Sequence, residues 1–342
     1  MKQRSAHFRL LEYVIFLAVT VAVMCLCICV GSVRIPLRET LCVIGNAIAK
    51  RPQPDGAAVA IILSSRLPRV LCVALSGAAL SLCGAAMQGL LKNPLADGST
   101  LGVSSGASLG AALAIAFGVS FPSLPFAGTT VFAVVFAFLS LTVILALSYK
   151  LDFSLSTNTI ILIGVIFSMF MSSAISVVVT FAPEKLKSIT FWTMGSLQNS
   201  GYQDALLLLA AFVIFGTVIF LHARELNAFA VGEDNARHVG VNVRRTKLVI
   251  LIAVSVLIGV CVSVGGTIAF VGLVTPHMIR MLVGPNHRRL LPASAFGGAV
   301  FLLLADLVAR VAFNPLELPI GVVTSLVGAV VFIFIFYRTR KG

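Results

Sequence analysis

The chain has 342 residues, of which 59% are hydrophobic and only 11% are charged. Its mean hydropathy is +1.06. A soluble domain carries about 25% charged residues and lacks repeated apolar runs of about 20 residues, so this composition excludes a water-soluble globular protein. The formal net charge of +13 fits basic residues beside a membrane, and we expect no nucleic-acid partner. The predicted fold class is therefore an all-α, polytopic membrane protein that lies in a lipid bilayer.

Ten apolar segments follow one another along the chain, and no soluble segment between them is long enough for a second domain. We therefore expect about ten transmembrane helices in a single membrane domain over residues 1–342. The predicted spans are residues 10–33, 66–91, 99–120, 126–148, 155–181, 203–222, 246–265, 267–284, 290–313 and 318–337. The eighth span contains Gly265–Gly266 and Thr275–Pro276, which predict a short or broken helix.

The distribution of Lys and Arg predicts the orientation of the chain in the membrane. With the N-terminus inside, sixteen basic residues lie on the cytoplasmic side and nine on the outside, which favours two cytoplasmic termini. Six of the nine outside residues fall within residues 34–69. Such a cluster opposes the usual charge bias. It indicates either a basic rim that meets an external partner or a solvated loop balanced by Glu39 and Asp55.

A run of small residues, "LLKNPLADGSTLGVSSGASLGAALA", occupies residues 90–114. Lys92-Asn93-Pro94 predicts a turn between the second and third spans, and Asp97 and Ser99 could cap the following helix. The Gly, Ala and Ser residues after them predict a helix that packs closely on its neighbours, because membrane helices associate through small side chains.

No arrangement of residues typical of an enzyme is present in the sequence. It contains no G-x-x-x-x-G-K-[ST], H-E-x-x-H or G-x-S-x-G motif, so we expect no catalytic residue and no metal site. The seven cysteines lie in or beside apolar runs and are interpreted as small buried residues. Asp306 is the acidic residue well inside a span, four positions before Arg310. This spacing predicts a local ion pair, and a proton or substrate site is the alternative.

The longest polar loop on the predicted inside, residues 222–247, contains "VGEDNARHVGV". Its pattern predicts a short helix at about 226–238 that Gly240 ends. This helix is interpreted either as an amphipathic surface helix or as a docking helix for a cytosolic partner.

Several sequence blocks, in order, resemble the FecCD family of permeases. The first is "RLPRVLCVALSGAALSLCGAAMQGLLKNPLADGSTLGVSSGASLGA". Later blocks are "FWTMGSLQ", "VGEDNARHVGV", "GGTIAFVGLVTPHMIRMLVGPNHRRLLPASA", "LLLADLVAR" and "ELPIGVVTSLVGAVVFIFIFYR". Members of this family are membrane subunits of ABC importers for iron–siderophores, haem and vitamin B12. The resemblance covers residues from about 60 to 338.

The resemblance implies partners and site residues. The chain would pair with a second permease subunit, identical or a sibling, in a bacterial or archaeal cytoplasmic membrane. Two cytosolic ATPase subunits would use ATP and Mg, this chain itself would bind no cofactor, and an extracytoplasmic binding protein would deliver the substrate. Arg66, Arg69 and Arg310 match the family's docking arginines. Loop 223–245 matches the segment that couples to the ATPase, with Gly232, Glu233, Asp234, Ala236, His238 and Gly240 in mechanical roles. Ser156, Thr157 and Asn158 match the cytoplasmic gate.

The fifth span supplies candidates for the translocation path, Ser168, Met171 and Ser172. We expect an ATP-powered importer of an iron–siderophore, haem or cobalamin, and the sequence leaves these substrates open. An ion-gradient-driven secondary transporter is the alternative, and it would require acidic residues in the membrane. A membrane-embedded enzyme would require converging nucleophile, base or metal ligands in the spans.

Overall fold

The computed structural model describes residues 10–31, 35–54, 56–119, 127–152 and 156–341, which form helices joined by short connections. The basic residues Lys2, Arg4, Arg9 and Arg34, which entered the orientation count, lie outside the described residues. The α-helices are α1 (Leu10–Cys29), α2 (Leu37–Ile48), α3 (Ala57–Ala60), α4 (Leu67–Leu90), α5 (Val103–Ala116), α6 (Ala127–Leu151), α7 (Thr157–Phe181), α8 (Leu186–Thr193), α9 (Tyr202–Ala211), α10 (Thr217–Leu221), α11 (Ala223–Val231), α12 (Glu233–His238), α13 (Val243–Gly265), α14 (Val271–Val283), α15 (His287–Val311) and α16 (Ile320–Lys341). The π-helical segments η1 (Ile61–Arg66) and η4 (Phe212–Gly216) join α3 to α4 and α9 to α10, and η2 (Gly98–Leu101) and η3 (Pro183–Lys185) are 3₁₀ turns.

The described helices confirm the ten predicted spans. Seven of them are long and apolar enough to cross a membrane, and the shorter apolar helices Val103–Ala116, Val271–Val283 and Ile320–Phe334 match the remaining three predictions. The eighth span is short, as expected, because residues 266–270 precede α14 without helical structure. Helices α2 and α8, which are too short to span a bilayer, were not predicted from the sequence.

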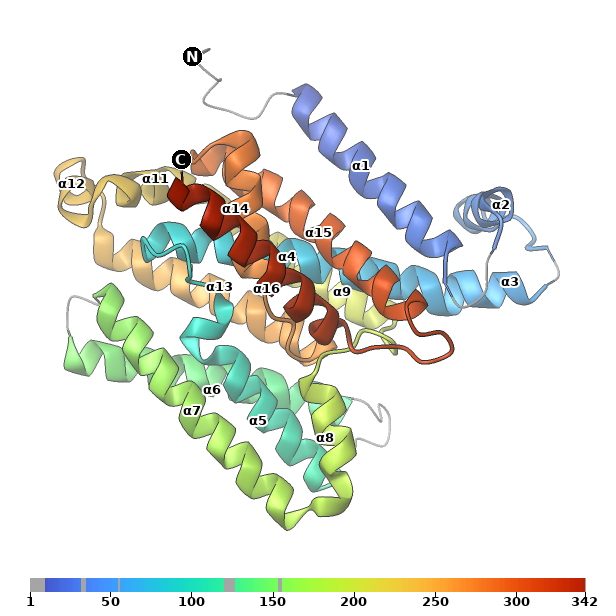
Figure 1. Cartoon of the computed structure of the whole chain (residues 1–342), viewed down its shortest axis with the longest axis horizontal. Coiled ribbons are helices and arrows are strands. Elements are labelled where there is room, and N and C mark those ends of the chain that lie inside the picture. Colours follow the sequence, from blue (N-terminus) through green and yellow to red (C-terminus); the bar gives the residue numbers. More distant parts are fainter. Residues whose placement is uncertain (1–9, 32–34, 55, 120–126, 153–155, 342) are drawn as a thin grey trace.

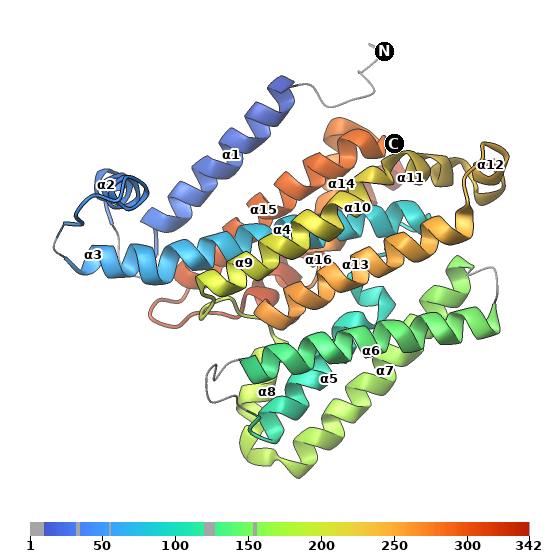
Figure 2. The same ribbon diagram turned by 180° about the vertical axis from the view of Figure 1, so that it is seen from behind.

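Helices α4 and α13 form the centre of the bundle. Burial differs within the most apolar 18-residue window of each long helix. In that window 78% of the residues are buried in the continuous helix Ala57–Leu90 and 72% in α13, against 17% in α1 and 22% in α7. Figures 1 and 2 show α4 between α15 and the α9–α10 helix, whereas α5, α6 and α7 pack together as a separate layer. The peripheral helices therefore leave large apolar surfaces for lipid or for other subunits.

Glycine allows α4 to touch its neighbours backbone to backbone. A Cβ atom on Gly84 would lie 1.9 Å from the carbonyl oxygen of Gly272 in α14, and one on Gly77 would lie 2.3 Å from that of Gly298 in α15. No side chain larger than hydrogen fits at either crossing. The glycines at these crossings thus set the distances between α4 and its neighbours α14 and α15.

The small-residue run also packs closely, as predicted. A Cβ atom on Gly110 would lie 2.4 Å from the carbonyl oxygen of Phe132 in α6. The predicted capping of this helix by Asp97 or Ser99 is wrong. Helix α5 begins later, and its N-cap is Gly102, which has the left-handed conformation with φ 71° and no side-chain capping bond. The extra 3₁₀ turn η2 displaces the helix start, and glycine adopts this backbone at little cost.

A proline inside α14 is compensated from α4. Pro276 has no N–H to donate to the carbonyl of Gly272, four residues earlier. Gln88 replaces that donor, since its Nε2 lies 3.3 Å from the Gly272 oxygen and 3.1 Å from the Leu273 oxygen. The same side chain accepts from Arg280 Nη2 at 3.1 Å. One buried amide of α4 therefore satisfies three polar groups of α14 where water is absent.

Replacing Gln88 by methionine is expected to lower the free energy of unfolding by about 2 kcal/mol, because the substitution leaves buried polar groups of α14 without partners. Chemical unfolding in detergent measures this value. Gln198→Met is the matched control, because Gln198 is exposed and should change stability by less than about 0.5 kcal/mol. Equal effects of the two substitutions would contradict the assigned role of Gln88.

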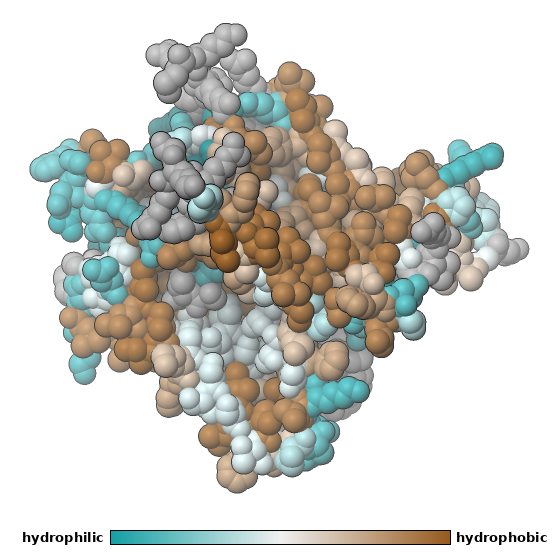
Figure 3. Space-filling model, in the orientation of Figure 1, coloured by the Kyte–Doolittle hydropathy of each residue, from teal (hydrophilic) through white to brown (hydrophobic). Residues whose placement is uncertain are grey.

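The described ends of the chain lie at one end of the molecule. Both views place the beginning of α1, the end of α16 and the pair α11–α12 at one end, with α2, α3 and the connection between α15 and α16 at the opposite end. Figure 3 shows apolar side chains across the middle of one face and polar side chains gathered near these two ends. This pattern agrees with a bundle that crosses a bilayer and exposes both ends to water.

Candidate functional site

A buried charge cluster joins α4 and α15 at the end that carries α2. Arg69 donates from Nε and Nη2 to Asp306 Oδ1, at 3.0 and 2.9 Å, and from Nη1 to Glu317 Oε2 at 2.8 Å. Arg310 Nε lies 2.9 Å from Asp306 Oδ2, which confirms the ion pair predicted from the four-residue spacing. Asp306 is completely buried. It therefore serves as the shared counter-ion of two arginines.

The other arginine contacts of this cluster are to the last carbonyls of α1. Arg66 Nη1 lies 2.6 Å from the Ile28 oxygen, and Arg310 Nη2 lies 3.1 Å from the Cys27 oxygen. A helix end leaves four carbonyls without intrahelical donors and carries partial negative charge, so guanidinium groups stabilise it. The two arginines thus cap a helix from which they are separated by 38 and 283 positions in the sequence.

The three arginines that match the family's docking residues, Arg66, Arg69 and Arg310, are buried in this structure. Their exposed fractions are only 6%, 7% and 5%, because α1 and Asp306 cover them. Exposed cations on this end of the molecule include Arg38 on α2 and the following Lys50 and Arg51. Whether the three buried arginines contact a binding protein stays a prediction.

The predicted coupling segment contains two helices rather than one. The single helix expected at about 226–238 is wrong, because Gly232 has φ 140° and separates α11 from α12. This extended backbone with positive φ is accessible essentially to glycine alone. Gly240, with φ 87°, ends α12 as predicted, and the N–H of Val241 donates to the carbonyl oxygen of Ala236. The segment is thus a compact, sharply turned element.

One buried ion pair attaches α12 to the start of α13. Lys247 is fully buried and its Nζ lies 2.7 Å from Glu233 Oε1. Ala236 is buried as well, whereas Asp234 and His238 are exposed. The helix therefore has one side fixed to the bundle and one side available to a partner. The Lys247 contact carries no local sequence signal, since fourteen positions separate the two charges.

Helix α11 is attached to the start of α15 by side-chain hydrogen bonds. The backbone N–H of His287 and its Nδ1–H both donate to Asn227 Oδ1, at 2.8 and 2.9 Å. Asn227 Nδ2 donates to Asn286 Oδ1 at 2.9 Å. Through these contacts a movement of α11 would be transmitted to a helix that continues across the membrane.

The predicted gate residues lie at the start of α7. Ser156 is the N-cap of this helix, and its hydroxyl accepts from the N–H of Thr159. Asp152, which the sequence analysis did not single out, accepts from the N–H of Ser156 at 3.2 Å and from the hydroxyl of Thr159 at 3.3 Å. Thr157 is half-buried and Asn158 is exposed. These contacts join the end of α6 to the start of α7 at the end of the molecule that carries α12, and the gating role remains a prediction.

A cavity of about 290 Å³ lies between the α5–α7 layer and the central helices. Of the three predicted path residues, Ser172 lines it, together with Ser104, Ser105 and Ser108. Ser168 instead donates to the Gly164 carbonyl of its own helix, and Met171 does not line the cavity. The small-residue run therefore has two sides, glycines that pack on α6 and serines that face this cavity. From the sequence, the whole run was expected to be a packing surface.

Comparisons with known proteins agree with this arrangement. Residues 19–338 match the model of the FecCD transport family. The ABC transporter permease protein YvrB of Bacillus subtilis is 43% identical over 99% of this chain and 97% of its own length. The hemin transport system permease protein HmuU of Yersinia pestis is 40% identical over 82% of this chain and 84% of its own length.

A solved structure has the same fold. It is described as an inward-facing conformation of a "metal-chelate type ABC transporter", and it is 31% identical with a TM-score of 0.83. The match covers 94% of this chain and 97% of the other. The resemblance noted from the sequence blocks is thereby confirmed over nearly the whole chain. The chain belongs to the FecCD transport family and is a permease subunit of the ABC-importer type.

Proposed function

We propose that this chain forms the passive path of an ATP-driven importer that carries a metal chelate or corrinoid into the cell. The observation that carries the proposal is the turned segment α11–α12, held to the bundle by Lys247 and Asn227. Its other side remains exposed for a cytosolic ATPase. Relatives named for hemin, cobalamin and iron(3+)-hydroxamate transport support this substrate class.

The secondary transporter considered as an alternative finds less support. Such a protein requires a membrane carboxylate that gains and loses a proton or an ion during transport. Asp306 is the residue that suggested this role, and it is held between Arg69 and Arg310 at 2.9 Å from each. Both of its carboxylate oxygens contact guanidinium groups, so Asp306 serves as their structural counter-ion and is not free to bind a transported ion.

In the proposed orientation both termini and α11–α12 face the cytoplasm, and α2 with the α15–α16 connection faces the outside. Exposed Arg38, Lys50 and Arg51 attract an acidic binding protein, and the buried cluster of Arg66, Arg69 and Arg310 becomes accessible only if α1 moves. Exposed charge pairs contribute about 0–1 kcal/mol each, which suits a partner that dissociates in every cycle.

The second permease subunit is proposed to pack on the apolar outer faces of α7 and α16. Ile166, Met169 and Phe170 on α7 are more than half exposed, as are Val330 and Ile333 on α16. Two copies facing each other would place the gate at Ser156–Asn158 and the serine-lined cavity near a shared axis. ATP-driven closure of the ATPase subunits would then move α11–α12 and change the state of the gate.

Uptake by the reconstituted importer tests this function. Vesicles should contain the permease, both ATPase subunits and the binding protein, with labelled iron–siderophore, haem or cobalamin outside. Uptake of at least one substrate should require ATP and the binding protein. Transport that persists without the ATPase subunits, or that an ion gradient alone drives, would contradict the proposal.

A further inference from the structure

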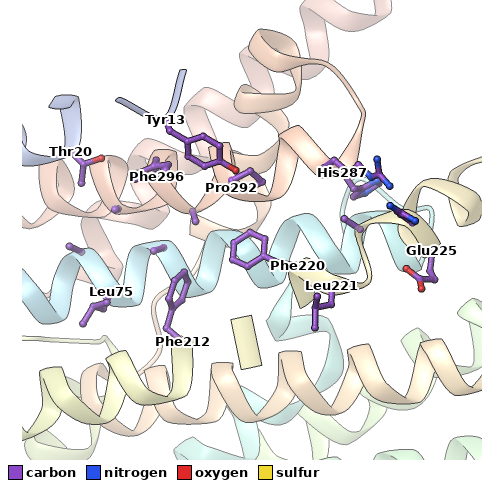
Figure 4. A pocket seen from close by; sticks show the side chains of 17 residues that line it. Tyr13, Thr20, Leu75, Phe212, Phe220, Leu221, Glu225, His287, Pro292 and Phe296 are labelled. Atoms are coloured by element: carbon purple, nitrogen blue, oxygen red, sulfur yellow. The ribbon is translucent and has the colours of Figure 1, made fainter. Parts of the chain in front are cut away.

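A second and larger cavity lies on the other side of α4 from the serine-lined cavity. It has a volume of about 930 Å³ and is bounded by α1, α4, the α9–α10 helix, α11 and α15. Figure 4 shows its two unlike ends. Leu75, Phe212 and Thr20 surround one end, whereas His287 and Glu225 lie at the other. The cavity is therefore amphipathic along its length.

The cavity is part of the surface that a bilayer would cover. Its wall includes Leu221, which is 72% exposed, and Tyr13 of α1, which is 40% exposed. Helix α1 is the least buried of the long apolar helices. A molecule that enters from the side would come from the membrane, because the apolar length of the cavity is parallel to transmembrane helices.

The polar end of the cavity favours a negative charge. Arg224 and Arg288 both line it, and Arg224 is exposed and makes no ion pair within the described part of the chain. Glu225 lines the same end, so the side chains together carry one net positive charge. His287 closes this end. The Nδ1–H of His287 donates to Asn227 Oδ1, and its Nε2 is directed toward Gly89 of α4.

The N-terminus of α11 adds to this charge. Its first-turn residues Ala223 and Arg224 line the cavity, and no side chain caps this helix end. N-terminal N–H groups carry partial positive charge and bind phosphate and other anions. The first N–H groups of α15 already donate to Asn227 and Asn286, so this helix contributes its Arg288 side chain instead. Two arginines and one helix N-terminus thus converge beside an apolar channel.

We propose that this cavity binds an anionic glycerophospholipid from the bilayer, with an acyl chain along Leu75 and Phe212 and the phosphate at Arg224 and Arg288. Basic pockets between transmembrane helices on the cytoplasmic side bind such headgroups. The assignment to the inner leaflet rests on the orientation proposed above. The lipid would contact α1, α4 and α15 and the first turn of the coupling segment at once. It is a structural ligand, separate from the transported substrate.

Native mass spectrometry of the intact importer tests lipid binding without any transport measurement. The probes are phosphatidylglycerol and phosphatidylcholine with identical acyl chains. We expect phosphatidylglycerol to be retained about fivefold or more over phosphatidylcholine. Arg224→Gln should weaken its retention about fivefold, and Arg224→Gln/Arg288→Gln about 25-fold, since each basic residue near a membrane surface contributes about one such factor. Ala78→Phe, which places a ring in the apolar part of the cavity, should displace both lipids.

The matched control is Arg237→Gln/Arg245→Gln. It removes two charges from the same end of the molecule, at residues that do not line the cavity. It should leave retention unchanged within about twofold. If the double cavity variant fails to fold, the exposed Arg224→Gln variant alone decides. Equal retention of the two lipids, equal losses in the cavity and control variants, or full retention in Ala78→Phe would each overturn the proposal. The result is independent of whether the importer transports the proposed substrates.

Discussion

Replacing Asp306 by alanine is expected to lower the free energy of unfolding by about 3–5 kcal/mol. The substitution removes a fully buried carboxylate that lies 2.9 Å from both Arg69 and Arg310. Two buried guanidinium groups then lose their shared counter-ion, and the cost of uncompensated buried charge exceeds that of the lost contacts. Reversible unfolding of the purified protein in detergent measures the difference from the native chain.

Two further variants test whether the lost charge of Asp306 causes this destabilisation. Asp306→Asn keeps an acceptor for Arg69 but removes the charge, so its effect should be intermediate. Glu184→Ala removes an exposed acid and should change stability by less than about 0.5 kcal/mol. If Asp306→Ala costs less than about 1 kcal/mol, the carboxylate contributes little to stability, and the arginines are held mainly by Glu317 and the carbonyls at the end of α1.

Replacing Lys247 by methionine is expected to detach the coupling helix. The fully buried ammonium group lies 2.7 Å from Glu233, the first residue of α12. Breaking a fully buried pair costs about 3–5 kcal/mol, and because Glu233 keeps part of its surface in water we expect about 2 kcal/mol here. The population with α12 packed on α13 would fall about 30-fold relative to the detached state.

Amide hydrogen exchange of residues 233–241 in the intact complex measures this detachment. Exchange should accelerate there and remain unchanged in α4. ATP hydrolysis in the importer should continue while substrate uptake falls, because the two processes lose their mechanical connection. Lys150→Met, at an exposed lysine of α6, is the control. Unchanged exchange in Lys247→Met would show that other contacts hold α12, and the assigned role would be wrong.

The predicted spans agree with the structure to within a few residues at most of their ends, and the physical reason is the bilayer. Backbone groups in lipid must be satisfied inside one helix, so an apolar run of about 20 residues has few alternatives. The largest difference is at α4, whose helix extends back to Ala57, and the start of α5 moves to Val103. Both starts depend on local backbone geometry, the π-helical segment η1 and the 3₁₀ turn η2, that hydrophobicity does not report.

The contacts between charges could be predicted only where they are local. The Asp306–Arg310 pair follows from helical spacing and is confirmed. Arg69 reaches the same carboxylate across 237 positions, and the carbonyls of α1 that bind Arg66 carry no sequence signal. Without those partners the arginines seemed free for an external protein. Their burial follows from which helices are neighbours.

The sequence by itself determined the class of protein, the number of spans, the family and the positions of small residues where helices cross. These properties depend on composition and on periodicity within one helix, which are local. Only the tertiary structure decided which side of each helix is covered. It places Ser104 and Ser172 around one cavity, and it brings Arg224 and Arg288 to the polar end of another. Such sites combine residues from several helices, and their geometry exists only after the helices have packed.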